Sequence, residues 1–242
     1  MIHNAAQFDF KAPESISRAR RVLIKPSAHY SAGYPVTTSR DLLARIIKGI
    51  RWISDADIVI LDGTPNGAPI QPVYQSLGYD FPRVLTLDVK DSNCVEVDNP
   101  LTKPFIIPTF WVPNIILSSD YLISVAPLKV VKGQGHMSIA NLMSLLPVIK
   151  YGGAKEGWRN LHALGLDKVL ADLYFTLPFD MGIVEARQKF ITDDDPVHGT
   201  AEDVGKIFMG KPFEVDLEVS ESMGIKADYM ENIKLGREEV EI

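Results

Sequence analysis

Four charged residues lie near the carboxyl ends of apolar segments that are typical of buried strands. "RVLIKP", "DADIVILDG", "DYLISVAPLK" and "DMGIVEA" carry, in that order, Lys25, Asp62, Lys129 and Glu185. If these strands are parallel, their carboxyl ends meet at one edge of the sheet, where open α/β folds bind ligands. We expect Lys25 and Lys129 to hold an anionic metabolite, and Asp62 or Glu185 to move a proton. Simple ion pairing at a solvated rim is the alternative.

The segment after Lys129 joins a glycine-rich loop to a predicted helix. In "KVVKGQGHMSIANLMSLLP", Gly135 precedes Ser138, a candidate N-cap, and the unsatisfied amides of a helix start attract phosphate or carboxylate. His136 lies where loop and helix meet, so we expect it to take part in proton transfer, although a surface or capping histidine is the alternative. The glycines form no complete nucleotide-binding motif. We therefore predict an anion site here, not a nucleotide site.

Further polar residues accompany these two lysines along the chain. Asn141 lies with Ala140 and Ser144 on the side of the predicted helix opposite its apolar face, which suits close approach to a ligand. The loop after Lys25 brings several polar side chains toward the same crevice. The additional candidates for contact with the ligand are Ser27, His29, Tyr30, Lys132, Gly135, Ser138 and Asn141.

One acidic loop resembles a metal site in composition. "TDDDPVHG" brings together Asp193, Asp194, Asp195 and His198, which are ligand types used by magnesium, manganese and zinc. Aspartates before a proline more often form a solvated turn, and no second metal-ligand motif accompanies them. We expect no metal ligands and no cofactor, and leave a divalent cation as an open alternative.

The order of the predicted elements indicates an α/β protein. An amphipathic segment, "TTSRDLLARIIKGIRWI", lies between the first two strands and predicts a crossover helix. We expect one α/β domain over 1–242, with a mostly parallel or mixed central sheet, helices on both faces and an irregular lead-in over 1–19. The other elements predicted are helices at 69–79, 166–177 and 212–224, an extended pair at 94–99 and 104–110, and a last extended segment at 232–242.

Composition excludes several classes of protein. The 242 residues are 46% hydrophobic and 23% charged, which is ordinary for a soluble globular domain. A net charge of −6 opposes non-specific binding to nucleic acid or to anionic membranes. The single cysteine, Cys94, cannot form an intrachain disulfide, and no apolar run approaches the roughly 20 residues of a membrane span. We expect a cytoplasmic protein that binds a small molecule, and leave homo-oligomerisation open.

The order of the segments resembles the family named domain of unknown function 362. "VLIKPS", "DYLISVAPLKV", "ANLMSLLP", "VHG" and "PFEVDLEVSESMG" resemble its successive motifs from about residue 21 onward. The resemblance implies a single α/β domain and assigns no reaction. It places five residues at motif positions, which are Lys25, Lys129, Asn141, Gly199 and Asp216, and so makes Asp216 a further candidate for the binding site.

The chain departs from this family pattern at several positions. Ser27 stands in place of asparagine, Val131 in place of histidine, Ala140 in place of lysine and Glu185 in place of aspartate. The chain also lacks the iron–sulfur ferredoxin modules of many relatives, so a redox role would need an external electron donor. The resemblance therefore indicates a divergent, specialised member.

Three functions remain open from the sequence. The leading hypothesis is an enzyme that acts on a small anionic metabolite by acid–base chemistry, of isomerase, lyase or cyclase type. The second is a non-catalytic accessory protein that binds a metabolite or a metal. The third is a redox enzyme with an external electron donor.

Overall fold

A mixed central sheet organises the computed structural model, which describes residues 1–152, 157–193 and 195–240. Over these residues the sheet has eight strands in the order β1-β10-β9-β7-β2-β3-β4, with β8 paired to β7. This confirms the predicted α/β class. The strands are β1 (Ile2–Asn4), β2 (Arg21–Pro26), β3 (Asp57–Asp62), β4 (Val84–Asp88), β7 (Tyr121–Val131), β8 (Gln134–His136), β9 (Met181–Thr192) and β10 (Thr200–Gly210).

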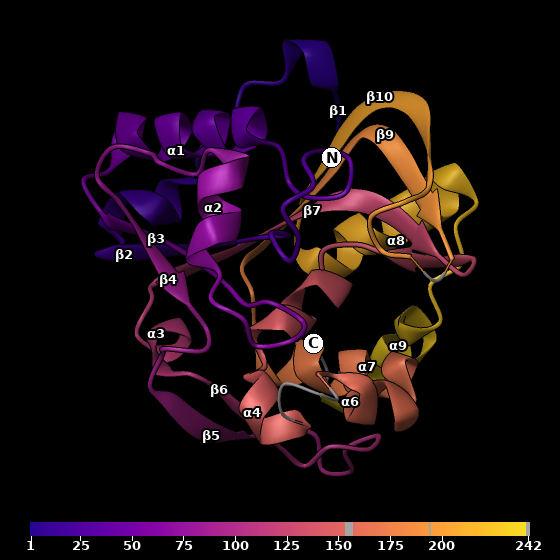
Figure 1. Cartoon of the computed structure of the whole chain (residues 1–242). Helices are drawn as coiled ribbons and strands as arrows, with labels where there is room; N and C mark the ends of the chain where they lie inside the picture. The colour runs from indigo at the N-terminus through magenta and orange to yellow at the C-terminus, as the bar shows by residue number, and fades with distance from the viewer. Residues whose placement is uncertain (153–156, 194, 241–242) are drawn as a thin grey trace.

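The centre of the sheet is parallel. β2 pairs in parallel with β3 and with β7, β3 with β4, and β7 with β9, whereas β10 and β1 extend the sheet in antiparallel fashion. The parallel strands are nearly continuous runs of valine, isoleucine and leucine, as expected for strands buried on both faces. Because these strands are parallel, their carboxyl ends point toward the same edge of the sheet. Figure 1 shows the arrangement of the elements.

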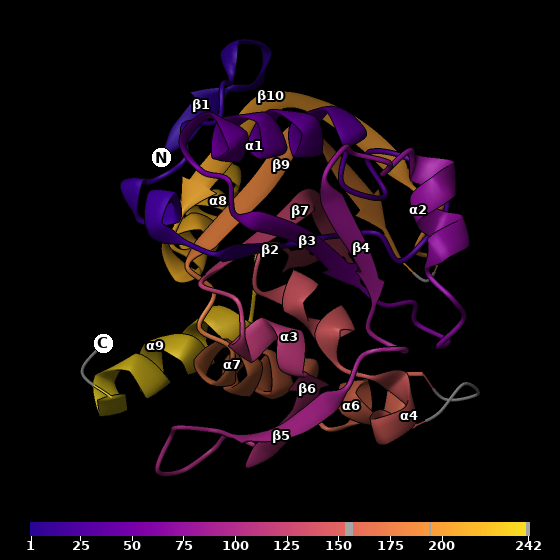
Figure 2. The same cartoon turned by 90° about the vertical axis from the view of Figure 1, so that its left-hand side faces the viewer.

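Two helices cover one face of the sheet (Figure 2). These are α1 (Arg40–Ile53) and α2 (Gln71–Leu77). The short 3-10 turns η1 (Ala5–Gln7) and η2 (Glu14–Arg18) pack into the core on the same face. Ser39 caps α1 by accepting a hydrogen bond from the amide of Leu42. The helix buries Leu42, Leu43, Ile46, Ile47 and Ile50 against the sheet.

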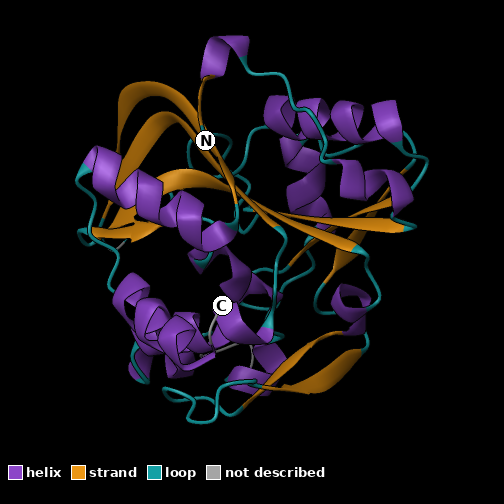
Figure 3. Ribbon diagram, turned by 180° about the vertical axis from the view of Figure 1, so that it is seen from behind, coloured by secondary structure: helices purple, strands orange, loops and turns teal. Residues whose placement is uncertain are grey.

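The remaining helices lie on the opposite side of the sheet (Figure 3). They are α3 (Asn114–Leu117), η3 (Ala140–Leu145), α4 (Val148–Tyr151), α6 (Arg159–Ala163), α7 (Leu166–Thr176), α8 (Pro212–Met223) and α9 (Tyr229–Val240). A separate two-stranded sheet of β5 (Cys94–Asp98) and β6 (Thr109–Pro113) lies beyond them. No helix in the described ranges is long and apolar enough to cross a membrane.

Two terminal predictions are wrong. The lead-in over 1–19 is not wholly irregular, because β1 pairs with β10 and adds an edge strand to the sheet. The predicted extended segment at 232–242 is, as far as residue 240, part of helix α9. Gly236 made this helix hard to recognise from the sequence, because glycine is unfavourable in the interior of a helix. A Cβ at that position would lie 2.5 Å from a ring carbon of Phe175, so the glycine permits close packing of α9 against α7.

Candidate ligand-binding site

A buried ion pair joins the carboxyl ends of β2 and β3. Lys25 Nζ lies 2.8 Å from Asp62 Oδ1, and both side chains are fully buried. The ammonium group also donates to the carbonyl of Pro26 at 2.7 Å and to Asn141 Oδ1 at 3.0 Å. Asp62 accepts further hydrogen bonds from Ala28 N at 2.7 Å, Gly63 N at 2.8 Å and Ser144 Oγ at 2.5 Å. Such additional hydrogen bonds are what a buried ion pair needs to offset the loss of hydration.

Both members of this pair are ionised near pH 7. Burial lowers the pKa of Lys25 to about 8, although Asp62 opposes the shift. Burial acts to raise the pKa of Asp62, but Lys25 and His29 outweigh it and hold that pKa well below its usual range. The Lys25–Asp62 pair therefore provides fixed charges under the site.

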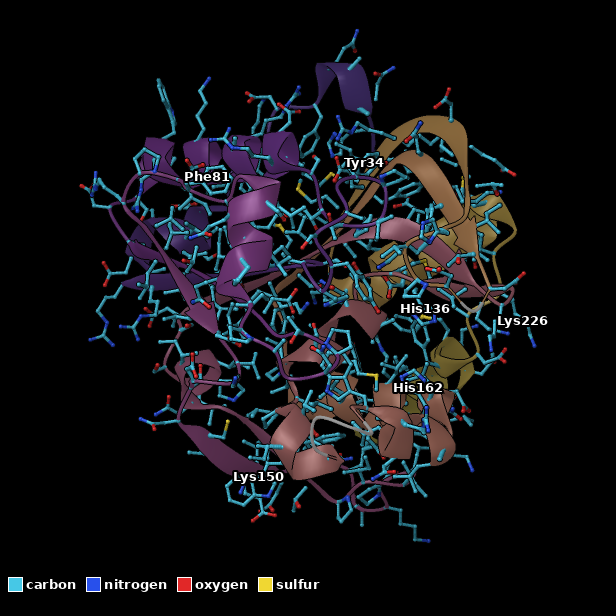
Figure 4. The ribbon with its side chains drawn as sticks, viewed as in Figure 1. Tyr34, Phe81, His136, Lys150, His162 and Lys226 are labelled. Atoms are coloured by element: carbon cyan, nitrogen blue, oxygen red, sulfur yellow. The ribbon has the colours of Figure 1, made fainter. Side chains whose placement is uncertain are left out.

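A cavity of about 510 Å³ lies beside this pair. Lys25 and Asp62 do not line it themselves, but their partners His29, Asn141 and Ser144 do. The cavity lies between the sheet and the helices of the opposite layer. Figure 4 shows His136 on the sheet side of this region and His162 on the helical side. The polar residues of the lining are Ser27, His29, Tyr30, Lys129, His136, Asn141, Ser144, Arg159, His162, Thr192 and Asp193.

Lys129 is the half-buried cation of the cavity wall. Its Nζ lies 3.3 Å from Ser27 Oγ and 3.3 Å from the carbonyl oxygen of Val36, and it makes no salt bridge within the described chain. Burial, with a further contribution from the nearby Lys25, lowers its pKa to about 8. His136 lies directly across the β7–β8 pair from Lys129. An anion in the cavity would supply the negative partner that Lys129 lacks.

The three histidines of the lining are neutral at pH 7. Burial lowers the pKa of His136 to about 4, with Lys129 adding to the effect, and burial also lowers the pKa values of His29 and His162. His29 Nδ1 lies 3.4 Å from Asp62 Oδ2, and its ring packs edge-on against Trp158. Neutral imidazoles can accept a proton from a bound molecule.

The predicted glycine loop is a tight hairpin. Lys132 and Gly133 form the two-residue turn between β7 and β8, with φ of 50° and 77°, as a type I′ turn requires. Lys132 is exposed at the tip and lies outside the cavity lining. Gly135 also has a structural role, since its amide donates to Lys226 O at 2.7 Å and a Cβ there would lie 2.8 Å from Ile225.

The predicted anion site at the helix start is wrong, because a carboxylate of the chain itself occupies it. The amides of Ser138 and Ile139 each donate to Asp216 at 3.0 Å, and the Ser138 hydroxyl donates to it at 2.7 Å. Ser138 is not an N-cap, and the expected helix is the short 3-10 turn η3, which has no side-chain cap. Ser138 and Asp216 therefore fix the backbone below the cavity and do not line it.

Glu185 lies on the other face of the sheet. Its neighbours Val184 and Ala186 pack in the core on the cavity side, so the alternation of the strand turns Glu185 toward α1. There it accepts hydrogen bonds from the Ser39 amide at 2.9 Å and hydroxyl at 2.6 Å, and pairs with Arg187 at 2.6 Å. It lines a separate cavity of about 300 Å³. Glu185 and Lys129 thus do not share a crevice.

The acidic loop does not assemble a metal site among the residues that the structure describes. No group of three or more His, Cys, Asp or Glu side chains in that part of the chain is placed to hold a metal ion. Asp195 instead pairs with His198 at 2.8 Å on the surface, and Asp193 lines the 510 Å³ cavity. Asp194 lies outside the described residues.

Sequence reasoning missed the helical wall of the cavity. His162, Trp158 and Arg159 contribute to the lining from α6 and the residue before it. A short helix with one histidine carries no periodic or spacing signal, so only tertiary packing reveals its role.

Three positions at which the chain departs from the family pattern, Ser27, Val131 and Ala140, all line this cavity.

Comparison with known proteins agrees with the motif order. No curated protein matches the chain in sequence. The family model described as domain of unknown function (DUF362) matches residues 22–219, which include every strand that contributes to the cavity. The chain therefore belongs to the DUF362 family.

Proposed function

We propose that this chain is an enzyme that binds a small anionic metabolite in the 510 Å³ cavity and acts on it by acid–base chemistry. One observation carries the proposal. The lining brings Lys129, which makes no salt bridge to another described residue, together with three histidines. This cation favours an anion, and the neutral imidazoles provide proton acceptors next to it.

Lys129 and His29 have distinct roles in the proposed reaction. The ammonium group of Lys129 binds the anionic group and stabilises the negative charge that develops when a proton leaves the adjacent carbon. Asp62 faces His29 Nδ1 at 3.4 Å and so orients the ring, which leaves Nε2 to accept the proton. Asp62 acts through His29 and is a positioning residue.

His136 is the second proton carrier in this proposal. It lies opposite Lys129 on the β7–β8 hairpin, and its low pKa of about 4 keeps the imidazole neutral. Either imidazole, once it has taken a proton from the substrate and become imidazolium, can return that same proton to a neighbouring atom and so isomerise the substrate, whereas loss of a leaving group would give elimination. General acid–base catalysis of this kind contributes about 10²- to 10⁴-fold to a rate. Glu185 has no part in it, because it faces the other side of the sheet.

The test is deuterium incorporation from heavy water. Native mass spectrometry of the purified protein first identifies any ligand that co-purifies, and an extract of anionic metabolites is then incubated with the protein in D₂O. We expect one metabolite to gain deuterium or change mass with the wild-type chain, and to remain unchanged with Lys129→Met and His29→Asn.

Lys168→Met is the matched control, because Lys168 lies on α7 with an exposed side chain outside the cavity lining. This variant should retain the wild-type reaction. A ligand that binds at Lys129 without any exchange or turnover would instead identify a non-catalytic binding protein. Exchange that survives in Lys129→Met would contradict the proposed site.

A further inference from the structure

The lining of the cavity has a polar part and an apolar part. The polar side chains Ser27, Asn141 and Ser144 are held by hydrogen bonds to Lys129, Lys25 and Asp62, respectively. They therefore cluster at the carboxyl ends of β2 and β3, where the charges lie. The apolar part of the described lining includes Met137, Met143, Leu166 and Leu170.

The apolar part is a continuous wall made by three elements. Leu166 and Leu170 are one turn apart on α7 and thus lie on the same side of that helix. Met143 comes from η3, and Met137 directly follows β8. All four side chains belong to, or pack against, the hydrophobic core on this face of the sheet. These side chains offer water no strong hydrogen-bond partner, so an apolar group would displace it favourably.

The size of the cavity exceeds the needs of an anionic group alone. Its volume is about 510 Å³. A carboxylate or phosphate group occupies only a small part of this space. The volume falls within the roughly 300–1,000 Å³ of sites that enclose a drug-sized ligand.

We infer that the ligand is an amphipathic oxyanion, whose carboxylate or phosphate group binds at Lys129 and whose apolar body lies along Met137, Met143, Leu166 and Leu170. The inference rests on the proposed anion site and adds the chemical class of the molecule that enters it. Flexible methionines in this wall suit a body of irregular shape. The polar groups at the strand ends fix one end of the ligand, and the α7 wall selects for the other.

A series of acids with increasing chain length tests this class. Acetate, butanoate, hexanoate and octanoate are titrated into the protein by calorimetry, beside inorganic phosphate and hexyl phosphate to compare the two head groups. Each pair of added methylenes should strengthen binding about tenfold until the apolar part is filled. Lys129→Met should weaken every member about ten- to a hundredfold, because each loses the same charge-assisted contact.

Leu166→Asn should flatten the dependence on chain length while acetate binds as before. Leu164→Asn is its control, because Leu164 lies two residues before Leu166, is 47% exposed and is not among the residues that line the cavity. Circular dichroism checks that each variant is folded, and Leu166→Ala replaces Leu166→Asn if the polar variant unfolds.

The outcomes separate the inference from the proposed function. Equal binding of acetate and octanoate, still weakened by Lys129→Met, would overturn the inference and leave the anion site standing. No binding of any anion would overturn both. Tight binding of octanoate that is unaffected by Lys129→Met would show that no anionic group is held there, and would also overturn both.

Discussion

Asp62 and Asp216 are both fully buried, yet their surroundings shift their pKa values in opposite directions. Each accepts hydrogen bonds from two backbone amides and one serine hydroxyl, Ser144 for Asp62 and Ser138 for Asp216. Asp62 also pairs with Lys25, whereas the additional donor to Asp216 is the hydroxyl of Tyr229. The pKa of Asp62 is accordingly held well below its usual range, while burial raises the pKa of Asp216 to about 6 despite its hydrogen bonds.

The two carboxyl groups also differ in their place in the structure, because Asp62 lies beside the cavity and Asp216 links two structural elements. The Lys25–Asp62 pair stays ionised and orients two groups that line the cavity, Asn141 and Ser144, and Asp62 Oδ2 lies 3.4 Å from a third, His29 Nδ1. Asp216 instead links α8 to the backbone before η3 and has no contact with the cavity. Burial alone therefore does not decide whether a carboxylate stays ionised. Asp62 has the cationic partner Lys25, and the comparison can be tested by removing that partner.

Removing the cation should have the largest effect. Lys25→Met leaves Asp62 buried without its ion pair, so we expect the free energy of unfolding at pH 7 to fall by about 3–5 kcal/mol. Urea denaturation monitored by circular dichroism measures it. The double variant Lys25→Met with Asp62→Asn removes both charges and should lose less than the sum of the two single losses. A loss below about 1 kcal/mol in Lys25→Met would show that the pair is not needed to hold Asp62.

Asp216 should make stability depend on pH in the opposite sense to an ion-paired carboxylate. Its folded pKa of about 6 exceeds the ordinary value of 3.8, so between these values the folded state binds a proton that the unfolded state has lost. Stability from this group is thus full below about pH 4, falls as pH rises to about 6, and then stays constant. The total change is about 3 kcal/mol.

Urea denaturation at several pH values from about 4 to about 7 checks this change. Asp216→Asn should remove that part of the pH dependence, whereas Asp228→Asn, at a partly exposed residue of the same region, should retain it. An unchanged pH profile in Asp216→Asn would mean that this carboxyl is ionised throughout, like Asp62.

Removing the serine hydroxyl that donates to each carboxyl group should change the free energy of unfolding by a smaller amount and tests the same difference between Asp62 and Asp216. At about pH 5 Asp62 is ionised and Asp216 is protonated, so Ser144 donates to a charged acceptor and Ser138 to a neutral group. We expect Ser144→Ala to lower the free energy of unfolding by about 1.5–3 kcal/mol and Ser138→Ala by about 1 kcal/mol. Equal losses at this pH would show that the two carboxyl groups do not differ in charge.

The strand ends were predictable because they depend on local pattern. The apolar runs before Lys25, Asp62 and Lys129 predict parallel strands, and parallel strands bring their carboxyl ends to one edge. Glu185 satisfied the same pattern but faces α1, because the side of the sheet depends on the register of β9 against its neighbours. A one-residue shift in register would have reversed its direction.

The partners of the helix start could not be predicted from local pattern. Whether the amides of Ser138 and Ile139 are free to bind an anion depends on Asp216, which is 78 residues away from Ser138 in sequence. His162 likewise reaches the cavity only through the packing of α6. Strand composition thus predicts which charges approach the edge of the sheet, while long-range packing decides which of them remain available to a ligand.

The pH dependence of hexanoate binding tests the central claim, that the charge of Lys129 holds an anion. Hexanoate stays ionised from about pH 6.5 to about pH 9.5, whereas the pKa of Lys129 is about 8. Calorimetry should show constant affinity below about pH 8 and a loss approaching tenfold per pH unit above it. Lys129→Met should bind hexanoate weakly and should not show this loss of affinity above about pH 8. That result would assign the loss to Lys129 and not to Lys25, whose pKa is also about 8. Affinity that stays constant to about pH 9.5 in the wild-type chain would contradict the claim.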